Sequence, residues 1–286
     1  MHKIAHMTAA VLAATACSAQ AADVIELWPE GAPNKSTITA AEETNAQGSI
    51  FNVTRARLEV SAPANPNGKA VIVIPGGGYG NLSMSTIEKS FVPFFHSQGF
   101  TTFVLKYRLP KGNPEVPLAD ANKAVETVRS LFGKYNLHTV GVMGASAGGH
   151  LAAMSSVSCK GAACPDFSVL VYPNITMMQE ESQPKSSCRN NLIGPAPSVK
   201  NDTTNSAYKH LSHTPPPPYL AVSAGDEYAG SLGSMLYARA MIENARPVTL
   251  HVYESGNHGW GAESSADFPD GDNFRTDLSM WLKKIK

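Results

Sequence analysis

Apolar residues along the chain form short uninterrupted runs that alternate with segments of helical periodicity. The clearest run, residues 70–75, reads Ala-Val-Ile-Val-Ile-Pro without polar alternation, as in a strand covered on both faces of its sheet. Further strands are predicted at residues 101–107, 139–143, 167–172, 219–224 and 248–253. Helices are predicted at residues 85–98, 118–135, 149–156, 232–244 and 270–286. This order predicts a single α/β domain with a mostly parallel, doubly wound sheet and helices on both faces.

Two regions depart from the alternation. Before the first core strand, residues 24–28 and 50–60 resemble strands, and the second is predicted to be an outer antiparallel strand. Residues 173–214 are polar, rich in proline and without periodicity, so they predict a small irregular insertion after a core strand. We expect this insertion to overhang the carboxyl edge of the sheet as a partial lid and to contribute little to stability.

The N-terminus has the pattern of an export signal. Met1-His2-Lys3 precedes an apolar run and then the small-x-small sequence Ser-Ala-Gln-Ala at residues 18–21. Residues 1–21 are therefore predicted to be removed on export to the periplasm or medium, which leaves residues 22–286 as the folded domain. A lipoprotein anchor at Cys17 is the weaker alternative, because Ala14 stands where such signals usually carry Leu.

Composition narrows the classes of partner. The chain has 286 residues, with 23 basic and 23 acidic side chains, and this balance gives no electrostatic case for nucleic acid or a membrane surface. Cys159, Cys164 and Cys188 lack a histidine pair at zinc-ligand spacing, so no metal site is predicted. Export permits a disulfide among these three cysteines, but their spacing leaves the pairing open.

The strongest chemical signal is Gly-Ala-Ser-Ala-Gly at residues 144–148. It lies between a predicted buried strand and a predicted helix, the context of a nucleophile elbow that exposes Ser146 on a sharp turn. Glycines two residues to either side let the strand and helix approach each other closely. A glycine-rich strand-to-helix turn also occurs for packing alone, so the motif needs partners.

Candidate partners follow in the chain order of an α/β-hydrolase, which is serine, then acid, then histidine. His258 follows the strand at residues 248–253, and Asp226 follows the strand at residues 219–224, so both lie at the carboxyl edge with Ser146. Asp226 would orient the imidazole of His258, which would act as the base. Glu227 and Glu254 are rival acids, and a loop histidine and a solvated carboxylate are the structural alternatives. His150 is one turn into the helix and is interpreted as structural.

Gly76-Gly77-Gly78 follows the first core strand and has the composition of an oxyanion loop without its usual leading histidine. The N–H groups of Gly77, Gly78 and Ala147 are the predicted donors to a developing oxyanion. A phosphate-binding loop is excluded, because neither the Gly-Lys-Ser/Thr ending nor the dinucleotide spacing is present.

Together, four segments resemble the bacterial acetyl esterase/lipase group of α/β-hydrolases, which includes acetylxylan and feruloyl esterases and relatives of hormone-sensitive lipase. They are Pro-Gly-Gly-Gly-Tyr at 75–79, Tyr-Arg-Leu at 107–109, the elbow with Gly149 and His150, and Tyr-Glu-Ser-Gly-Asn-His-Gly-Trp at 253–260. The opening Leu-Trp-Pro-Glu-Gly-Ala-Pro at 27–33 is similar to exported members that act on plant polysaccharide. The group often has Val-Pro three and four residues after its acid, whereas this chain has Ala229-Gly230.

The resemblance implies Ser146, Asp226 and His258 as a catalytic triad, and we expect Tyr79 and Trp260 to contact the substrate. The predicted activity is an exported serine carboxylesterase that removes short acyl groups, such as acetyl, from a small-molecule or polysaccharide ester through an acyl-enzyme. No cofactor is implied. The alternatives are a serine peptidase, which commonly carries a large extra domain in this fold, and a non-catalytic carbohydrate-binding protein.

Overall fold

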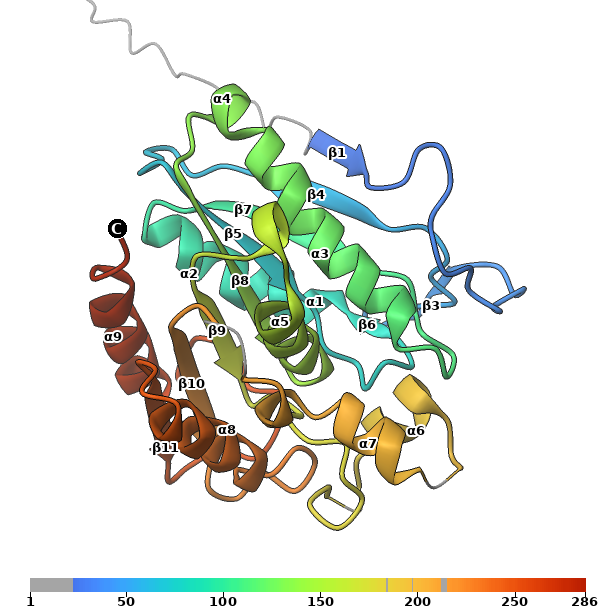
Figure 1. The fold of residues 1–286 in the computed structure, drawn as a ribbon. Helices are drawn as coiled ribbons and strands as arrows, with labels where there is room; N and C mark the ends of the chain where they lie inside the picture. Colours follow the sequence, from blue (N-terminus) through green and yellow to red (C-terminus); the bar gives the residue numbers. More distant parts are fainter. Residues whose placement is uncertain (1–22, 184, 197, 212–214) are drawn as a thin grey trace, which may run out of the picture.

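An eight-stranded sheet runs through the part of the chain that the structure, a computed structural model, describes: residues 23–183, 185–196, 198–211 and 215–286. Its order is β1-β4-β7-β5-β8-β9-β10-β11 (Figure 1). The strands are β1 (Asp23–Glu26), β4 (Arg57–Ser61), β5 (Lys69–Ile74), β7 (Thr101–Lys106), β8 (Thr139–Ala145), β9 (Ser168–Val171), β10 (Pro218–Ser223) and β11 (Thr249–Tyr253). The predicted signal at residues 1–21 lies outside the described residues.

The sheet is parallel from β7 to β11 and antiparallel at the edge formed by β1 and β4. Strand β8 lies near its centre, where Met143 pairs with Val73 on one side and Val169 on the other. Every residue of β8 is buried, because helices cover this part of the sheet on both faces. The predicted α/β fold with a mostly parallel sheet is thus confirmed.

Helices cover the faces of the sheet (Figure 1). They are α1 (Met84–Thr86), the π-helical turn Ile87–Phe91, α2 (Val92–Ser97), α3 (Glu115–Ser130), α4 (Phe132–Tyr135), α5 (Ala147–Ser158), α8 (Leu232–Glu243) and α9 (Gly271–Leu282). Figure 1 shows α3 and α5 side by side in front of the sheet. Helices α2 and α9 meet through the rings of Phe94 and Phe274. Among the described residues, no helix is both long and apolar enough to span a membrane.

The prediction of one outer antiparallel strand at residues 50–60 is correct only for its second half, where β4 pairs antiparallel with β1 and β7. The segment forms two strands, β3 (Ser49–Phe51) and β4, which belong to different sheets. Asn52 has a positive φ of 56°, so the chain turns directly after β3. Strand β3 pairs with β2 (Glu43–Thr44) and β6 (Leu82–Ser83) in a small three-stranded sheet. The polar residues in the middle of the segment form the connection between β3 and β4 and are not an irregular part of one strand.

The insertion at residues 173–214 is more ordered than its sequence suggests. It contains α6 (Cys188–Ile193), α7 (Val199–Thr204) and a 3-10 turn at Ala207–Lys209. Its apolar side chains enter the core: Met177, Cys188, Leu192 and Ala207 are all buried. Arg189 and Asp202 form a buried ion pair 2.7 Å apart. The burial of these side chains argues against the expectation that the segment contributes little to stability, because buried apolar surface stabilises a fold.

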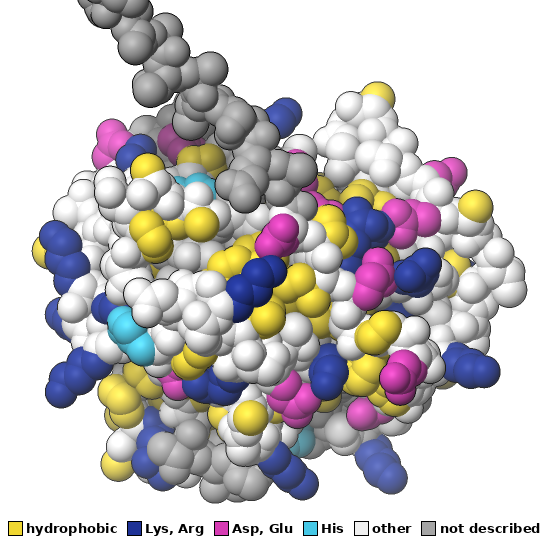
Figure 2. All heavy atoms as spheres, turned by 90° about the horizontal axis from the view of Figure 1, so that it is seen from above, with side chains coloured by type: hydrophobic (Ala, Val, Ile, Leu, Met, Phe, Trp, Pro, Cys, Tyr) yellow, Lys and Arg dark blue, Asp and Glu magenta, His cyan; other side chains and the backbone are white. Residues whose placement is uncertain are grey.

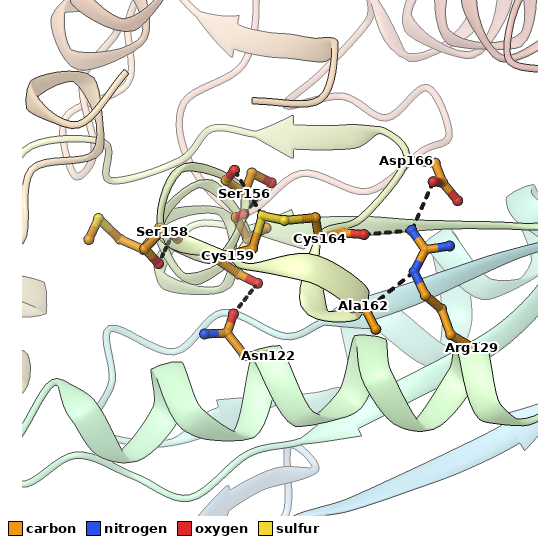
Figure 3. The surroundings of a disulfide bond; sticks show 11 residues. Asn122, Arg129, Ser156, Ser158, Cys159, Ala162, Cys164 and Asp166 are labelled. Carbon is orange, nitrogen blue, oxygen red and sulfur yellow. Dashed lines mark hydrogen bonds and ion pairs between the residues drawn. A yellow bond between two sulfur atoms is a disulfide. The ribbon is translucent and has the colours of Figure 1, made fainter. Parts of the chain in front are cut away.

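A disulfide joins Cys159 and Cys164 across the short turn that follows α5 (Figure 3). Arg129 of α3 lies beside it and contacts Asp166 at 2.8 Å, which attaches the turn to the neighbouring helix (Figure 3). Cys188 is a buried thiol. Its pKa is raised by burial, so it is a poor candidate for a reactive thiolate.

Charged side chains of both signs are mixed over the face seen from above Figure 1, where the parallel strands begin (Figure 2). The described residues also contain no group of three or more His, Cys, Asp or Glu side chains placed to hold a metal ion.

Candidate active site

Ser146 occupies a strained turn between β8 and α5. Its φ of 57° and ψ of −122° are unfavourable for a residue with a side chain. The flanking glycines make this turn possible: a Cβ on Gly144 would lie 2.1 Å from the carbonyl oxygen of Gly148. A Cβ on Gly148 would lie 2.2 Å from the carbonyl oxygen of Ile74. The elbow glycines are therefore required by close backbone approach.

A chain of hydrogen bonds connects three side chains from three separate loops. The Oγ of Ser146 lies 2.8 Å from Nε2 of His258, and Nδ1 of His258 lies 2.8 Å from Oδ2 of Asp226. Asp226 is 4% exposed, and its other oxygen accepts hydrogen bonds from the N–H groups of Tyr228 and Ala229 at 2.8 Å each. The second oxygen of Asp226 is thus held where it accepts a hydrogen bond from the N–H at Nδ1 of His258. This leaves Nε2 free to accept the proton of Ser146.

The rival acids lie elsewhere. Glu227 is exposed and forms an ion pair with Lys185 that lowers the pKa of its carboxyl group. Glu254 is also exposed, one residue beyond the end of β11. Neither carboxylate contacts His258, so the geometry favours Asp226 among the three candidates.

His150 is buried and points away from Ser146, as expected from its place one turn into α5. Its Nε2 lies 2.7 Å from the carbonyl oxygen of Asn205, and its Nδ1 lies 2.7 Å from the hydroxyl of Tyr79. A carbonyl can only accept, so Nε2 carries the proton and Nδ1 accepts from Tyr79. Burial lowers the pKa of His150 to about 4, so the ring is neutral near pH 7.

The glycine loop lies against the elbow. A Cβ on Gly76 would come within 3.0 Å of the Cβ of Ser146. Gly77 and Gly78 have φ values of 115° and 59°, which allow the loop to turn beside the serine. Among the described residues, none accepts a hydrogen bond from the N–H of Gly77, Gly78 or Ala147. These groups have the chemistry of an oxyanion hole, since they are preorganised donors without an internal acceptor.

A cavity of about 340 Å³ opens over Ser146. His258, Tyr172 and Tyr228 line one part of it, together with the glycine loop. The ring of Tyr172 packs edge-on against His258 with centroids 4.9 Å apart, and its hydroxyl donates to the carbonyl of Trp260 at 2.8 Å. Tyr172 therefore packs against the imidazole from the buried side. Tyr228, which is 45% exposed, packs against it from the solvent side.

The insertion supplies another wall of this cavity through Asn174, Lys185, Ser186 and Ser187. The side-chain oxygen of Asn174 lies 3.4 Å from the Oγ of Ser146, and its NH₂ group donates to the hydroxyl of Ser186 at 3.2 Å. Sequence reasoning placed the segment over the serine but singled out none of these residues. The position of Asn174, three residues past the end of β9 at the same sheet edge, is the signal that could have found it.

Tyr79 and Trp260 do not line the cavity over Ser146. Tyr79 is 2% exposed, with its hydroxyl on His150. Trp260 is 6% exposed and stacks on Phe268 with centroids 4.1 Å apart, while its indole N–H donates to Ser223. The expectation that both rings contact substrate at this cavity is not supported by these positions. Both rings pack inward against residues that are distant in sequence, His150 and Phe268.

The parallel sheet, the serine elbow after its central strand, and an acid and a histidine from later strands define the chain as an α/β-hydrolase. It belongs to the BD-FAE family, whose profile matches residues 58–228.

Individual proteins agree with this assignment. An acetylxylan esterase of Xylanibacter ruminicola is 33% identical in an alignment of 245 positions that covers 81% of this chain. The chain spans about half (48%) of that relative's length. A solved acetyl ester-xyloside bifunctional hydrolase from Caldicellulosiruptor lactoaceticus is 26% identical, with a TM-score of 0.72 over 92% of this chain and 96% of its own. A carboxylesterase of Lactobacillus plantarum, 18% identical, shares the fold with a TM-score of 0.67 over 85% of this chain and 96% of its own.

Proposed function

We propose that this chain is a serine esterase that hydrolyses short acyl esters of carbohydrates, acetyl esters in particular. The observation that carries the proposal is the pair of 2.8 Å contacts that link Asp226, His258 and Ser146 beside a loop of unpaired N–H groups. The names of the relatives from Xylanibacter and Caldicellulosiruptor support acetyl groups on a xylose-based carbohydrate as the substrate.

The mechanism follows from the geometry. Ser146 attacks the ester carbonyl while His258 takes its proton at Nε2, and Asp226 holds the ring and stabilises the imidazolium. The N–H groups of Gly77, Gly78 and Ala147 bind the oxyanion, and each such donor typically lowers the barrier by roughly 3 to 4 kcal/mol. His258 then returns the proton to the leaving alcohol. Water, activated by the same histidine, releases the acid from the acyl-enzyme.

The central test compares Ser146→Ala with Ser187→Ala, because both serines line the same cavity but only Ser146 contacts His258. Ser146→Ala is expected to lower turnover of p-nitrophenyl acetate by roughly six orders of magnitude, as when a triad loses its nucleophile. Ser187→Ala is expected to retain it. Acetate release from acetylated xylan tests the carbohydrate, and a peptide anilide tests the peptidase alternative. Full activity of pure Ser146→Ala would exclude the proposed nucleophile.

We further propose that the chain is exported and that its signal is cleaved after residue 21. The disulfide between Cys159 and Cys164 supports this proposal, since disulfides persist in oxidising compartments. Mass spectrometry of the mature protein should give an N-terminus at Ala22. A mature chain that begins at a lipid-modified Cys17 would favour the anchored alternative.

A further inference from the structure

A second cavity lies on the other side of the glycine loop. Its volume is about 540 Å³, larger than the 340 Å³ of the cavity over Ser146. The polar side chains that line it come from four separate parts of the chain: Thr37, Thr39, Asn52, Lys111, Asn190 and Asn191. Neither the mechanism nor the triad uses any of these residues.

Only a thin partition separates the two cavities. Gly78 lines the first cavity, and the next residue, Tyr79, lines the second. The start of α6 repeats the arrangement, with Ser187 in the first cavity and Asn190 in the second. The side chain of Asn191 donates to the carbonyl of Gly78 at 2.8 Å and closes the partition. The same loop and the same helix therefore contribute to the walls of both cavities.

The lining has the chemistry of a sugar site. Its accessible apolar lining comes from Ile38, Ala40 and Pro195, since Tyr79 and Leu109 are almost fully buried. Amide and hydroxyl groups supply the polar part of the lining. A pyranose ring presents apolar C–H faces and hydroxyl groups that both donate and accept hydrogen bonds. The side-chain amide of Asn can also do both, because its NH₂ group donates and its oxygen accepts. Lys111 is the one charged side chain among the described lining residues, and no carboxylate is present there. This lining matches a hydroxyl-rich ligand better than the acyl chain of a lipid.

The small three-stranded sheet explains how the wall formed by Thr37 and Thr39 is held. Strand β3 pairs with β6, which begins two residues after Gly80. Asn52, directly after β3, donates its side-chain N–H to the carbonyl of Ala41 at 3.1 Å. The N-terminal segment is thereby attached to the loop that carries Gly77 and Gly78.

We infer that the second cavity binds a sugar unit of the same carbohydrate chain whose acylated unit lies at Ser146. This inference rests on the proposed esterase function for its substrate class, but it concerns a separate set of residues. It gives the enzyme a preference for acetylated oligosaccharides over isolated acetylated sugars, because only a longer chain contacts both cavities.

The test blocks the second cavity and leaves the first unchanged. Thr39→Trp places a large ring in the cavity, and Thr276→Trp, at an exposed position on α9, is the matched control. Binding of unacetylated xylo-oligosaccharides is measured by calorimetry, and turnover is measured on acetylated xylo-oligosaccharides and on p-nitrophenyl acetate. Asn190→Ala is a milder second variant that removes one exposed amide from the wall.

Thr39→Trp is expected to weaken oligosaccharide binding and kcat/KM on acetylated oligosaccharides by about tenfold or more, the equivalent of one or two lost hydrogen bonds. Turnover of p-nitrophenyl acetate stays unchanged in all variants, and Thr276→Trp behaves as the wild type on every substrate. Wild-type protein that binds no oligosaccharide, or Thr39→Trp and Asn190→Ala proteins that bind it equally well, would overturn the inference. Oligosaccharide binding that is lost in Thr39→Trp, in a protein without p-nitrophenyl acetate turnover, would support the sugar site and refute the esterase proposal.

Discussion

The hydroxyl of Tyr79 donates to Nδ1 of His150 across 2.7 Å, and this bond connects the oxyanion loop to the elbow helix. Tyr79 directly follows Gly78, and His150 lies one turn after Ser146. The same imidazole donates from Nε2 to the carbonyl of Asn205 in the insertion. One buried ring therefore fixes three segments whose relative positions determine where the nucleophile and the oxyanion donors lie.

Tyr79→Phe should destabilise the fold, because it removes the donor to a buried ring nitrogen and leaves Nδ1 without a partner. An unsatisfied buried acceptor typically costs about 1 to 3 kcal/mol of unfolding free energy. The matched control is Tyr237→Phe, since Tyr237 is also fully buried but its hydroxyl has no partner among the described residues. Urea unfolding of both variants measures the difference. Equal stability of the two variants would show that the Tyr79–His150 bond contributes nothing.

His150 should make stability depend on pH. Its folded pKa of about 4 lies below its ordinary value of 6.5, because burial disfavours the charged ring. Between these values the unfolded chain binds a proton that the folded chain does not, so stability is lost as the pH falls from about 6.5 to about 4. The full loss from this residue is about 3 kcal/mol.

His150→Gln removes this titration, so the variant should show a shallower fall in unfolding free energy between about pH 7.5 and about pH 4 than the wild type. The difference between the two slopes is measured by urea unfolding at both pH values, which cancels the contribution of the other groups that titrate in this range. Parallel pH profiles for wild type and variant would contradict a buried neutral His150.

Asp226→Asn should lower esterase turnover by roughly four orders of magnitude near neutral pH, because it fixes the wrong tautomer of His258. Backbone N–H groups of Tyr228 and Ala229 hold one oxygen of the acid, so the amide of Asn would present its NH₂ group to Nδ1. The proton then sits on Nε2, which can no longer accept one from Ser146.

Glu227→Gln and Glu254→Gln are the controls for the acid, since both positions are exposed and neither carboxylate contacts His258. Both should retain turnover of p-nitrophenyl acetate within a few-fold, as surface substitutions generally do. A larger loss in Glu254→Gln than in Asp226→Asn would assign the acid to the loop that follows β11.

The succession of strands and helices along the chain and the place of Ser146, Asp226 and His258 could be predicted, because each depends on local signals: apolar runs, glycine spacing and position after a strand. The inward packing of Tyr79 and Trp260 could not, since burial depends on partners such as His150 and Phe268 that are distant in sequence. The second cavity could not be predicted from the sequence either. Its walls combine residues from before the first core strand with residues from the insertion, and no short stretch contains that juxtaposition.

The buried side chains of the insertion could not be predicted either, because the average polarity of residues 173–214 does not indicate which of its few apolar residues pack into the core. Leu192→Ala should therefore cost about 2 to 5 kcal/mol of unfolding free energy, as for a leucine removed from a packed core. The control is Val199→Ala in the same segment, where Val199 is 73% exposed and a change within about 0.5 kcal/mol is expected. Urea unfolding of both variants, with p-nitrophenyl acetate turnover measured on the folded protein, compares the two positions. If Leu192→Ala is as stable as Val199→Ala, the segment is a detachable cover over Ser146 and not part of the core that holds Asn174 and Ser186 in place.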